Sequence, residues 1–180
     1  MHPSRHRNAT GRLLDRLPKN VAFICLGNIC RSPFAAATLS QLVRDVAVVE
    51  SAGFIGPGRP PPEDALAAAR AFGTSRKKHR SKIVSRSLIK ESEAIFIFDR
   101  NNLRRFREID PQANARIYWL GDLDPLWSGR RTIVDPWGEG LAEFERTFAR
   151  VARCVEVVAD LMRAPSEGES RGPHRGQAIP

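Results

Sequence analysis

The residues best suited to chemistry lie in the segment CLGNICRSP, which runs from Cys25 to Pro33. A cysteine thiolate is a strong nucleophile, and Arg31 carries a planar guanidinium that can bind two phosphate oxygens at once. Gly27 and Asn28 tolerate a positive φ, so the loop can turn successive backbone N-H groups toward one tetrahedral oxyanion. The segment therefore predicts an anion-binding loop with a cysteine at its centre.

The end of this segment predicts the start of a helix. Ser32 is expected as the N-cap and Pro33 as the first helical residue, which leaves unpaired N-H groups facing the loop. These groups and Arg31 all favour Cys25 as the thiolate. The Cys-x5-Arg spacing alone is a weak signal, and the alternative is a buried structural cysteine followed by a solvated arginine. A strand before the loop and a helix after it make the signal specific.

The elements that must position this loop follow from the hydrophobic pattern. Short continuous apolar runs are typical of buried parallel strands, and four occur, at 21–25, 46–51, 94–98 and 115–120. Helical patterns lie between or after them, at 33–45, 62–72, 87–92, 101–108 and 141–163. This alternation predicts an α/β fold: a single domain with a four-stranded parallel sheet, flanked by helices on both faces. Ligands of such sheets bind at the carboxyl ends of the strands, where the loop after the first strand lies.

Composition sets the domain organisation. The chain has 180 residues, of which 42% are hydrophobic and 27% charged, and this excludes a collagen, a coiled coil and a wholly disordered chain. Residues 1–19 carry five basic residues against one acid and predict a disordered basic extension. Residues 165–180 are rich in Pro, Gly and Ser and predict a disordered tail. The folded domain is expected to cover residues 20–164.

Hydrophobic pattern, cysteine content and charge indicate where the protein is located and what kinds of partner it binds. No apolar run approaches the roughly 20 residues of a membrane helix or resembles a signal-peptide core, so we expect a cytoplasmic protein without membrane insertion. Three cysteines favour reduced thiols. A net charge of +9 favours anionic partners. Eight basic residues and no acid lie between Arg70 and Lys90, which indicates a solvated face; nucleic-acid binding is disfavoured because no aromatic residue lies between Gly73 and Lys90.

The segment CLGNICRSP resembles the phosphate-binding loop of the low-molecular-weight protein tyrosine phosphatases. Further matching segments are Ser51-Ala52-Gly53, His79-Arg80-Ser81, IFIFDRNNL around Asp99, and Asp135-Pro136-Trp137-Gly138. The resemblance implies hydrolysis of phosphotyrosine in proteins through a cysteinyl-phosphate intermediate, with no cofactor and no metal. The implied substrate is a phosphotyrosine-containing protein. A tyrosine kinase is one candidate that the resemblance suggests.

The resemblance also implies roles for the residues of the loop. Cys25 would be the nucleophile, and Arg31 would bind the phosphate and stabilise its oxygens. The other phosphate-binding positions would be Leu26, Gly27, Asn28, Ile29, Cys30 and Ser32.

A carboxyl group is needed to protonate the leaving oxygen and later to activate water. The residues alone offer two Asp-Pro pairs, Asp124-Pro125 and Asp135-Pro136. The resemblance favours Asp135, because Trp137 and Gly138 complete the family's motif, and it assigns Asp124 to a turn.

Supporting roles are implied in the same way. Ser32 would hydrogen-bond the Cys25 thiolate, and Asn28 would be held by Ser51 and His79. Cys30 would be a redox partner that forms a disulfide with an oxidised Cys25. The simpler alternative is that Cys30 is a small buried residue of the loop.

The chain departs from the family pattern after Ser51-Ala52-Gly53, where FIGPGRPPPED lacks the tryptophan that many members place beside the substrate ring. Phe54 or Trp137 would then form the aromatic wall, and a shallower loop would admit other aryl or alkyl phosphates. An arsenate reductase of the same fold is an alternative, but only Cys154, which we expect in the core, remains for its cysteine relay. A non-catalytic phosphate-binding or nucleic-acid-binding module is a third reading, which the presence of a nucleophile disfavours.

Overall fold

A computed structural model describes residues 2–112, 116–126 and 129–163 of the chain. Its sheet has four parallel strands in the order β2-β1-β3-β4, as predicted. Their bounds are Asn20–Cys25 (β1), Val48–Gly53 (β2), Ala94–Ile97 (β3) and Ile117–Trp119 (β4). The strand predicted at 46–51 begins two residues later and ends two residues later, and residue 115 of the last predicted strand lies outside the described residues.

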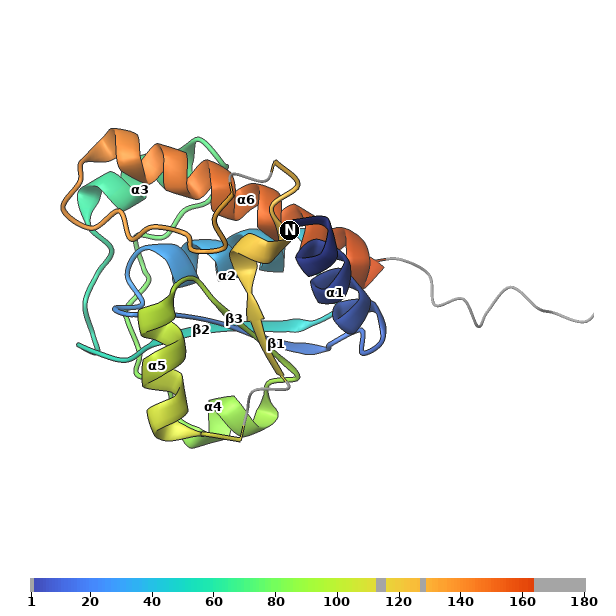
Figure 1. Cartoon of the computed structure of the whole chain (residues 1–180). Coiled ribbons are helices and arrows are strands. Elements are labelled where there is room, and N and C mark those ends of the chain that lie inside the picture. Colours follow the sequence, from blue (N-terminus) through green and yellow to red (C-terminus); the bar gives the residue numbers. More distant parts are fainter. Residues whose placement is uncertain (1, 113–115, 127–128, 164–180) are drawn as a thin grey trace, which may run out of the picture.

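Helices cover both faces of this sheet (Figure 1). On one side lie α2 (Arg31–Leu42), α3 (Glu63–Arg70) and α6 (Leu141–Arg163). On the other side lie α4 (Arg86–Glu91) and α5 (Arg100–Ile109). A short 3-10 helix, η2 (Leu120–Leu123), follows β4 directly. The predicted single domain with flanking helices is therefore confirmed.

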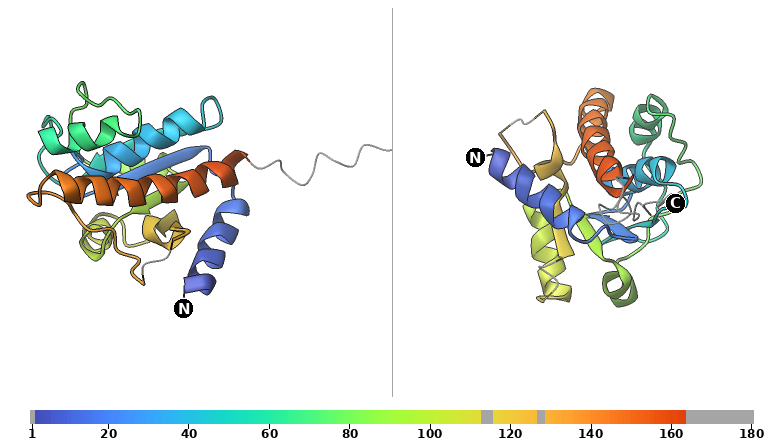
Figure 2. Two further views of the ribbon diagram at one scale, coloured as in Figure 1. Left: turned by 90° about the horizontal axis from the view of Figure 1, so that it is seen from above. Right: turned by 90° about the vertical axis from the view of Figure 1, so that its right-hand side faces the viewer.

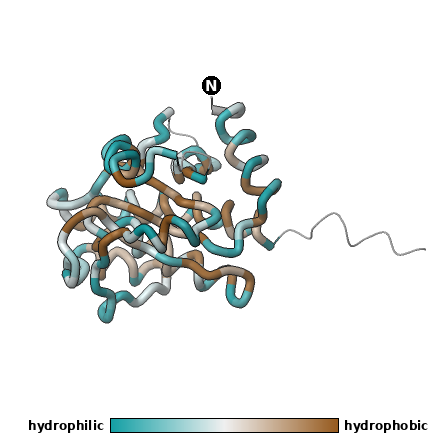
Figure 3. The backbone as a smooth tube through the Cα atoms, turned by 90° about the horizontal axis from the view of Figure 1, so that it is seen from below, coloured by the Kyte–Doolittle hydropathy of each residue, from teal (hydrophilic) through white to brown (hydrophobic). Residues whose placement is uncertain are grey.

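The alternation of side chains along the strands produces two cores. Phe23 and Phe96 stack at 5.1 Å between ring centroids on the α2 and α6 side, and Phe34 stacks on Phe148 at 4.0 Å. Ile24 and its neighbours form the second core beneath α4 and α5. Hydrophobic residues accordingly concentrate along the strands in Figure 3, and hydrophilic residues at the periphery.

Helix α6 has the bounds that its periodicity predicts. The predicted apolar stripe is buried, because spacings of three and four place it on one helical face; its members are Phe144, Phe148, Val151, Val155, Val158 and Met162. The helix runs along the sheet and packs against α2, α3 and η2 (Figure 2). No helix among the described residues is both long and apolar enough to cross a bilayer.

The N-terminal segment differs from the prediction. His2–Leu14 form a helix, α1, which packs against η2 and α6 rather than remaining disordered. Ala9 and Leu13 are four positions apart and are both buried in the larger core, which gives the basic segment a short apolar face. The predicted tail at 165–180 lies outside the described residues.

Candidate active site

The loop at the carboxyl end of β1 lies against β2. Cys25 ends β1 and is paired in register with Gly53, the last residue of β2. A Cβ atom at Gly53 would lie 2.8 Å from both the Asn28 nitrogen and the Leu26 oxygen, so only glycine allows the loop to approach so closely. In the described part of the chain, the N-H groups of residues 27–30 have no hydrogen-bond acceptor. They remain free to bind an anion.

Asn28 holds this loop in shape. Its φ is 51°, in the left-handed region, as expected. Its Nδ2 donates to the hydroxyls of Ser32 and Ser51, both at 3.0 Å, and its Oδ1 accepts from the Lys82 N-H at 3.0 Å. His79 Nε2 lies 2.7 Å from the Asn28 carbonyl oxygen. The structure thus brings together Asn28, Ser51 and His79.

One local prediction about the loop, the N-cap of the following helix, is wrong, and the positive φ that Gly27 tolerates is not used. Gly27 does not have a positive φ; a Cβ atom there would instead lie 2.9 Å from Arg59 Nη2, whose guanidinium donates to the Gly27 carbonyl. Ser32 is not the N-cap, because α2 begins at Arg31 with Cys30 in the cap position. The Ser32 hydroxyl instead donates to Cys25 Sγ at 3.0 Å and also lies 3.3 Å from the Ala52 carbonyl oxygen.

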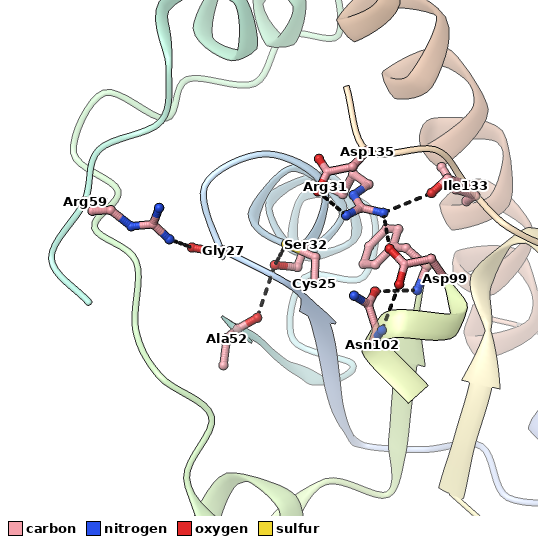
Figure 4. Close-up of polar contacts among 11 residues, drawn as sticks. Cys25, Gly27, Arg31, Ser32, Ala52, Arg59, Asp99, Asn102, Ile133 and Asp135 are labelled. Atoms are coloured by element: carbon pink, nitrogen blue, oxygen red, sulfur yellow. Dashed lines mark hydrogen bonds and ion pairs between the residues drawn. The ribbon is translucent and has the colours of Figure 1, made fainter. Parts of the chain in front are cut away.

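Arg31 is 1% exposed and is held at one end of its guanidinium (Figure 4). Its Nη1 donates to Asp99 Oδ2 at 2.7 Å and to the Ile133 carbonyl at 3.0 Å, and its Nη2 donates to Asp135 Oδ2 at 2.5 Å. Burial opposes the charge, but Cys25, Asp135 and Asp99 together raise the pKa of Arg31. Its Nε has no partner among the described residues, which leaves a buried donor for a ligand.

Asp99 is a site residue that was not predicted. It is the N-cap of α5, where its Oδ1 accepts from the Asn102 N-H at 2.7 Å while its Oδ2 pairs with Arg31. The available signal was its place directly after an apolar strand, at the sheet edge where the loop lies.

The two Asp-Pro pairs have different surroundings. Asp135 is 37% exposed and lines the same pocket as Cys25. Asp124 is completely buried, and its carboxylate pairs with Arg150 Nε at 2.8 Å and Arg153 Nε at 3.4 Å. Asp135 is therefore the carboxyl group that faces the loop.

The pocket over the loop has a volume of about 150 Å³. Its lining residues are Cys25, Leu26, Gly27, Ile29, Cys30, Ile55, Arg59, Asp135 and Trp137. Of the two expected wall residues, only Trp137 lines it; Phe54 packs against the second core instead. Ile55 and Arg59 were not predicted, although their positions just after Ser51-Ala52-Gly53 place them at the same edge as Cys25.

The remaining candidates differ in burial. Cys30 is buried, and burial together with the neighbouring Cys25 raises the pKa of its thiol. Cys154 is buried in the larger core, as expected. His79 is partly buried, and burial lowers its pKa although the hydrogen bond to Asn28 opposes this shift. The expectation of a solvated basic face is wrong at Arg76, which is 6% exposed.

Comparisons with known proteins agree with this geometry. The family model described as "Low molecular weight phosphotyrosine protein phosphatase" matches residues 20–166. A human protein of that name is 31% identical over 159 residues, covering 81% of this chain and 96% of the relative.

Two solved structures resemble the fold. The tyrosine phosphatase AmsI of Erwinia amylovora has a TM-score of 0.74 at 20% identity, covering 82% of this chain and 95% of that chain. The YwlE arginine phosphatase of Geobacillus stearothermophilus has a TM-score of 0.71 at 25% identity, covering 79% of this chain and 92% of that chain. Because the family model spans most of the sequence, the chain belongs to the low molecular weight phosphotyrosine protein phosphatase family.

Proposed function

We propose that this protein hydrolyses phosphotyrosine in proteins, with Cys25 as the nucleophile. The observation that carries the proposal is the shared pocket: Cys25 Sγ and Asp135 line one cavity over a loop whose N-H groups and Arg31 Nε are unpaired in the described chain. A phosphoryl group in the loop would satisfy these donors and place phosphorus above the sulfur.

In the first step the Cys25 thiolate attacks phosphorus in line, forming the S-P bond as the bond from phosphorus to the tyrosyl oxygen breaks. Asp135 gives its proton to that oxygen, so that tyrosine leaves neutral. The bound phosphate competes with Asp135 for Arg31 Nη2, which frees the carboxyl group for this role. Arg31 and the loop N-H groups stabilise the charge on the equatorial oxygens.

In the second step Asp135, now a carboxylate, takes a proton from water as the water oxygen attacks phosphorus. The S-P bond breaks, inorganic phosphate is released, and Cys25 returns to the thiolate. The Ser32 hydroxyl, 3.0 Å from Cys25 Sγ, donates to the departing sulfur and makes it a better leaving group.

The lining of the pocket supports an aryl phosphate as the substrate. Ile29, Ile55 and the Trp137 ring supply apolar surface above the loop, which suits a planar phenyl group. Arg59 lies at the same mouth, and its positive charge disfavours a substrate whose phosphate is attached to a guanidinium, as in phosphoarginine. It favours phosphotyrosine in a peptide with acidic neighbours.

The test measures phosphate release from a phosphotyrosine peptide and from a matched phosphoarginine peptide, under reducing conditions. We expect turnover of the phosphotyrosine peptide, complete loss in Cys25→Ser, and retention in Cys154→Ala, which removes a thiol remote from the pocket. Acid quenching of the reaction should trap phosphate on Cys25. Preference for the phosphoarginine peptide would refute the proposed substrate, and activity in Cys25→Ser would refute the mechanism.

A further inference from the structure

Arg76 is a buried cation beside the loop, at the carbonyl of Cys30. It lies between α3 and α4, is 6% exposed, and points its Nη1 toward the Cys30 carbonyl oxygen at 3.5 Å, at the long limit of a hydrogen bond. Its Nη2 is buried without any hydrogen-bond partner among the described residues. Arg31 has two carboxylate partners, whereas Arg76 has no carboxylate partner in the described part of the chain.

A buried charge without a counter-charge destabilises a folded protein by several kcal/mol unless an anion lies close by. Burial lowers the pKa of Arg76 to about 10, and Cys25 and Cys30 partly offset this shift. The side chain is therefore cationic at neutral pH. Among the described residues, these two thiols are the groups whose negative charge would raise the pKa of Arg76. Burial raises the pKa of the Cys30 thiol, which disfavours a charge there. Cys25, whose sulfur accepts a hydrogen bond from Ser32 at 3.0 Å, is the better suited of the two to carry the counter-charge.

We propose that Arg76 is a positioning residue whose buried positive charge, held beside the loop at the Cys30 carbonyl, stabilises the Cys25 thiolate and later the phosphoryl group on it. The inference rests on the proposed function, because it concerns the nucleophile named there. Arg31 pairs with Asp135, which lines the pocket, whereas Arg76 contacts the loop at the Cys30 carbonyl and is not one of the lining residues. Of these two buried cations, Arg31 is neutralised by two carboxylates, whereas Arg76 has none in the described part of the chain.

Other charged or titratable groups near Cys25 also affect its thiolate, so the test must separate their influence from that of Arg76. They are Arg31 on α2, Cys30 in the loop and Asp135 before α6, and Asp99 on α5 acts through Arg31. His79, which contacts the loop at the Asn28 carbonyl, is a further titratable group, and Arg76 lowers its pKa. Loss of the Arg76 charge would favour protonated His79, and a positive His79 would oppose a rise in the alkylation midpoint. The other groups are not substituted in an Arg76 variant. A shift in thiolate formation would therefore report the charge at position 76.

The experiment measures the rate at which iodoacetamide alkylates Cys25 as a function of pH, with the modified peptide identified by mass spectrometry. Variants are Arg76→Met, which keeps the length and removes the charge, Arg76→Lys, which keeps the charge, and Arg76→Gln as a second neutral form. Lys78→Met is the matched control, because it removes an exposed charge two residues away. Alkylation needs no turnover, so it remains informative even if the enzyme proves inactive on phosphotyrosine.

In Arg76→Met and Arg76→Gln we expect the pH midpoint of alkylation to rise by about one unit, a tenfold loss of thiolate below the midpoint. Arg76→Lys should recover most of the shift, and Lys78→Met should match the wild type. A structural role alone would lower the melting temperature and leave the midpoint in place. We expect the reverse, a shifted midpoint with little loss of thermal stability, because removing Arg76 leaves no buried carboxylate without its partner among the described residues. Coincident midpoints in wild type, Arg76→Met and Arg76→Gln would overturn the inference.

Discussion

The two Asp-Pro pairs show how the same dipeptide takes two different places in one fold. Asp124 lies under α6 with no exposed surface, and two arginines of that helix neutralise it. Asp135 lies at the mouth of the pocket, more than a third exposed, and shares Arg31 with Asp99. A carboxylate enclosed by fixed cations holds the structure together, whereas one that is open to solvent on one side can exchange a proton with a substrate.

The two regions are physically connected. Arg150, which pairs with Asp124, also donates through Nη1 to the Thr132 carbonyl at 2.8 Å. The next residue, Ile133, donates its N-H to Phe98 and accepts from Arg31 through its carbonyl. The buried cluster around Asp124 therefore fixes the backbone three residues before Asp135.

The largest effect in this comparison is expected on kcat, from replacing Asp135 at the mouth of the pocket. Asp135→Asn removes the proposed proton donor but keeps the shape of the side chain, so kcat for the phosphotyrosine peptide should fall by about 10²–10⁴-fold. Stability should change little because the side chain is partly exposed. Steady-state kinetics over a series of aryl phosphates checks this, since the loss should grow with the basicity of the leaving phenolate. An equal loss for every leaving group would exclude Asp135 as the acid.

At the buried pair, Asp124-Pro125, we expect a smaller effect, and on stability rather than on kcat. Asp124→Asn leaves two cations near a neutral amide, and we expect a loss of about 2–3 kcal/mol in the free energy of unfolding; Arg153 is a third exposed, which limits the loss. Urea denaturation measures it. Asp160→Asn, which breaks an exposed pair with Arg163 on the same helix, should cost at most about 1 kcal/mol.

The comparison fails if Asp124→Asn, assayed well below its melting temperature, loses as much kcat as Asp135→Asn. In that case the two carboxylates would share one function.

The smallest effect concerns pH. Burial lowers the pKa of His79, so as pH falls through about 6.5 the unfolded state takes up the proton first and the folded state loses stability; the loss stops below the pKa of the folded state. Urea denaturation between pH 5 and 8 should show this loss in the wild type and in Asp124→Asn. His79→Gln should show less of it. An unchanged pH dependence in His79→Gln would show that other groups dominate.

The sheet, the long helix and the loop sequence were predictable because they depend on local patterns. Continuous apolar runs require buried strands, and the spacing along α6 requires one buried face. Gly-Asn after such a run indicated a curled loop, and Asn28 indeed has a positive φ. A resemblance over ordered segments favoured Asp135 over Asp124, which the residues alone had left open. It also added Ser51 and His79, which the residues alone did not link to the loop.

The amino-acid sequence by itself determined the fold class and the anion-binding loop that carries Cys25 and Arg31, the proposed nucleophile and phosphate-binding residue, because strand periodicity and loop chemistry are encoded within a few neighbouring residues. Only the tertiary structure decided which polar residues are buried and paired. Arg76 appears in a basic run that suits solvent, and its burial depends on the packing of the loop from α3 against Cys30. Three further features depend on contacts between segments that are distant in the sequence, and such contacts follow from the packing of the whole chain. Trp137 rather than Phe54 lines the pocket, α1 packs against η2 and α6, and Asp99 pairs with Arg31.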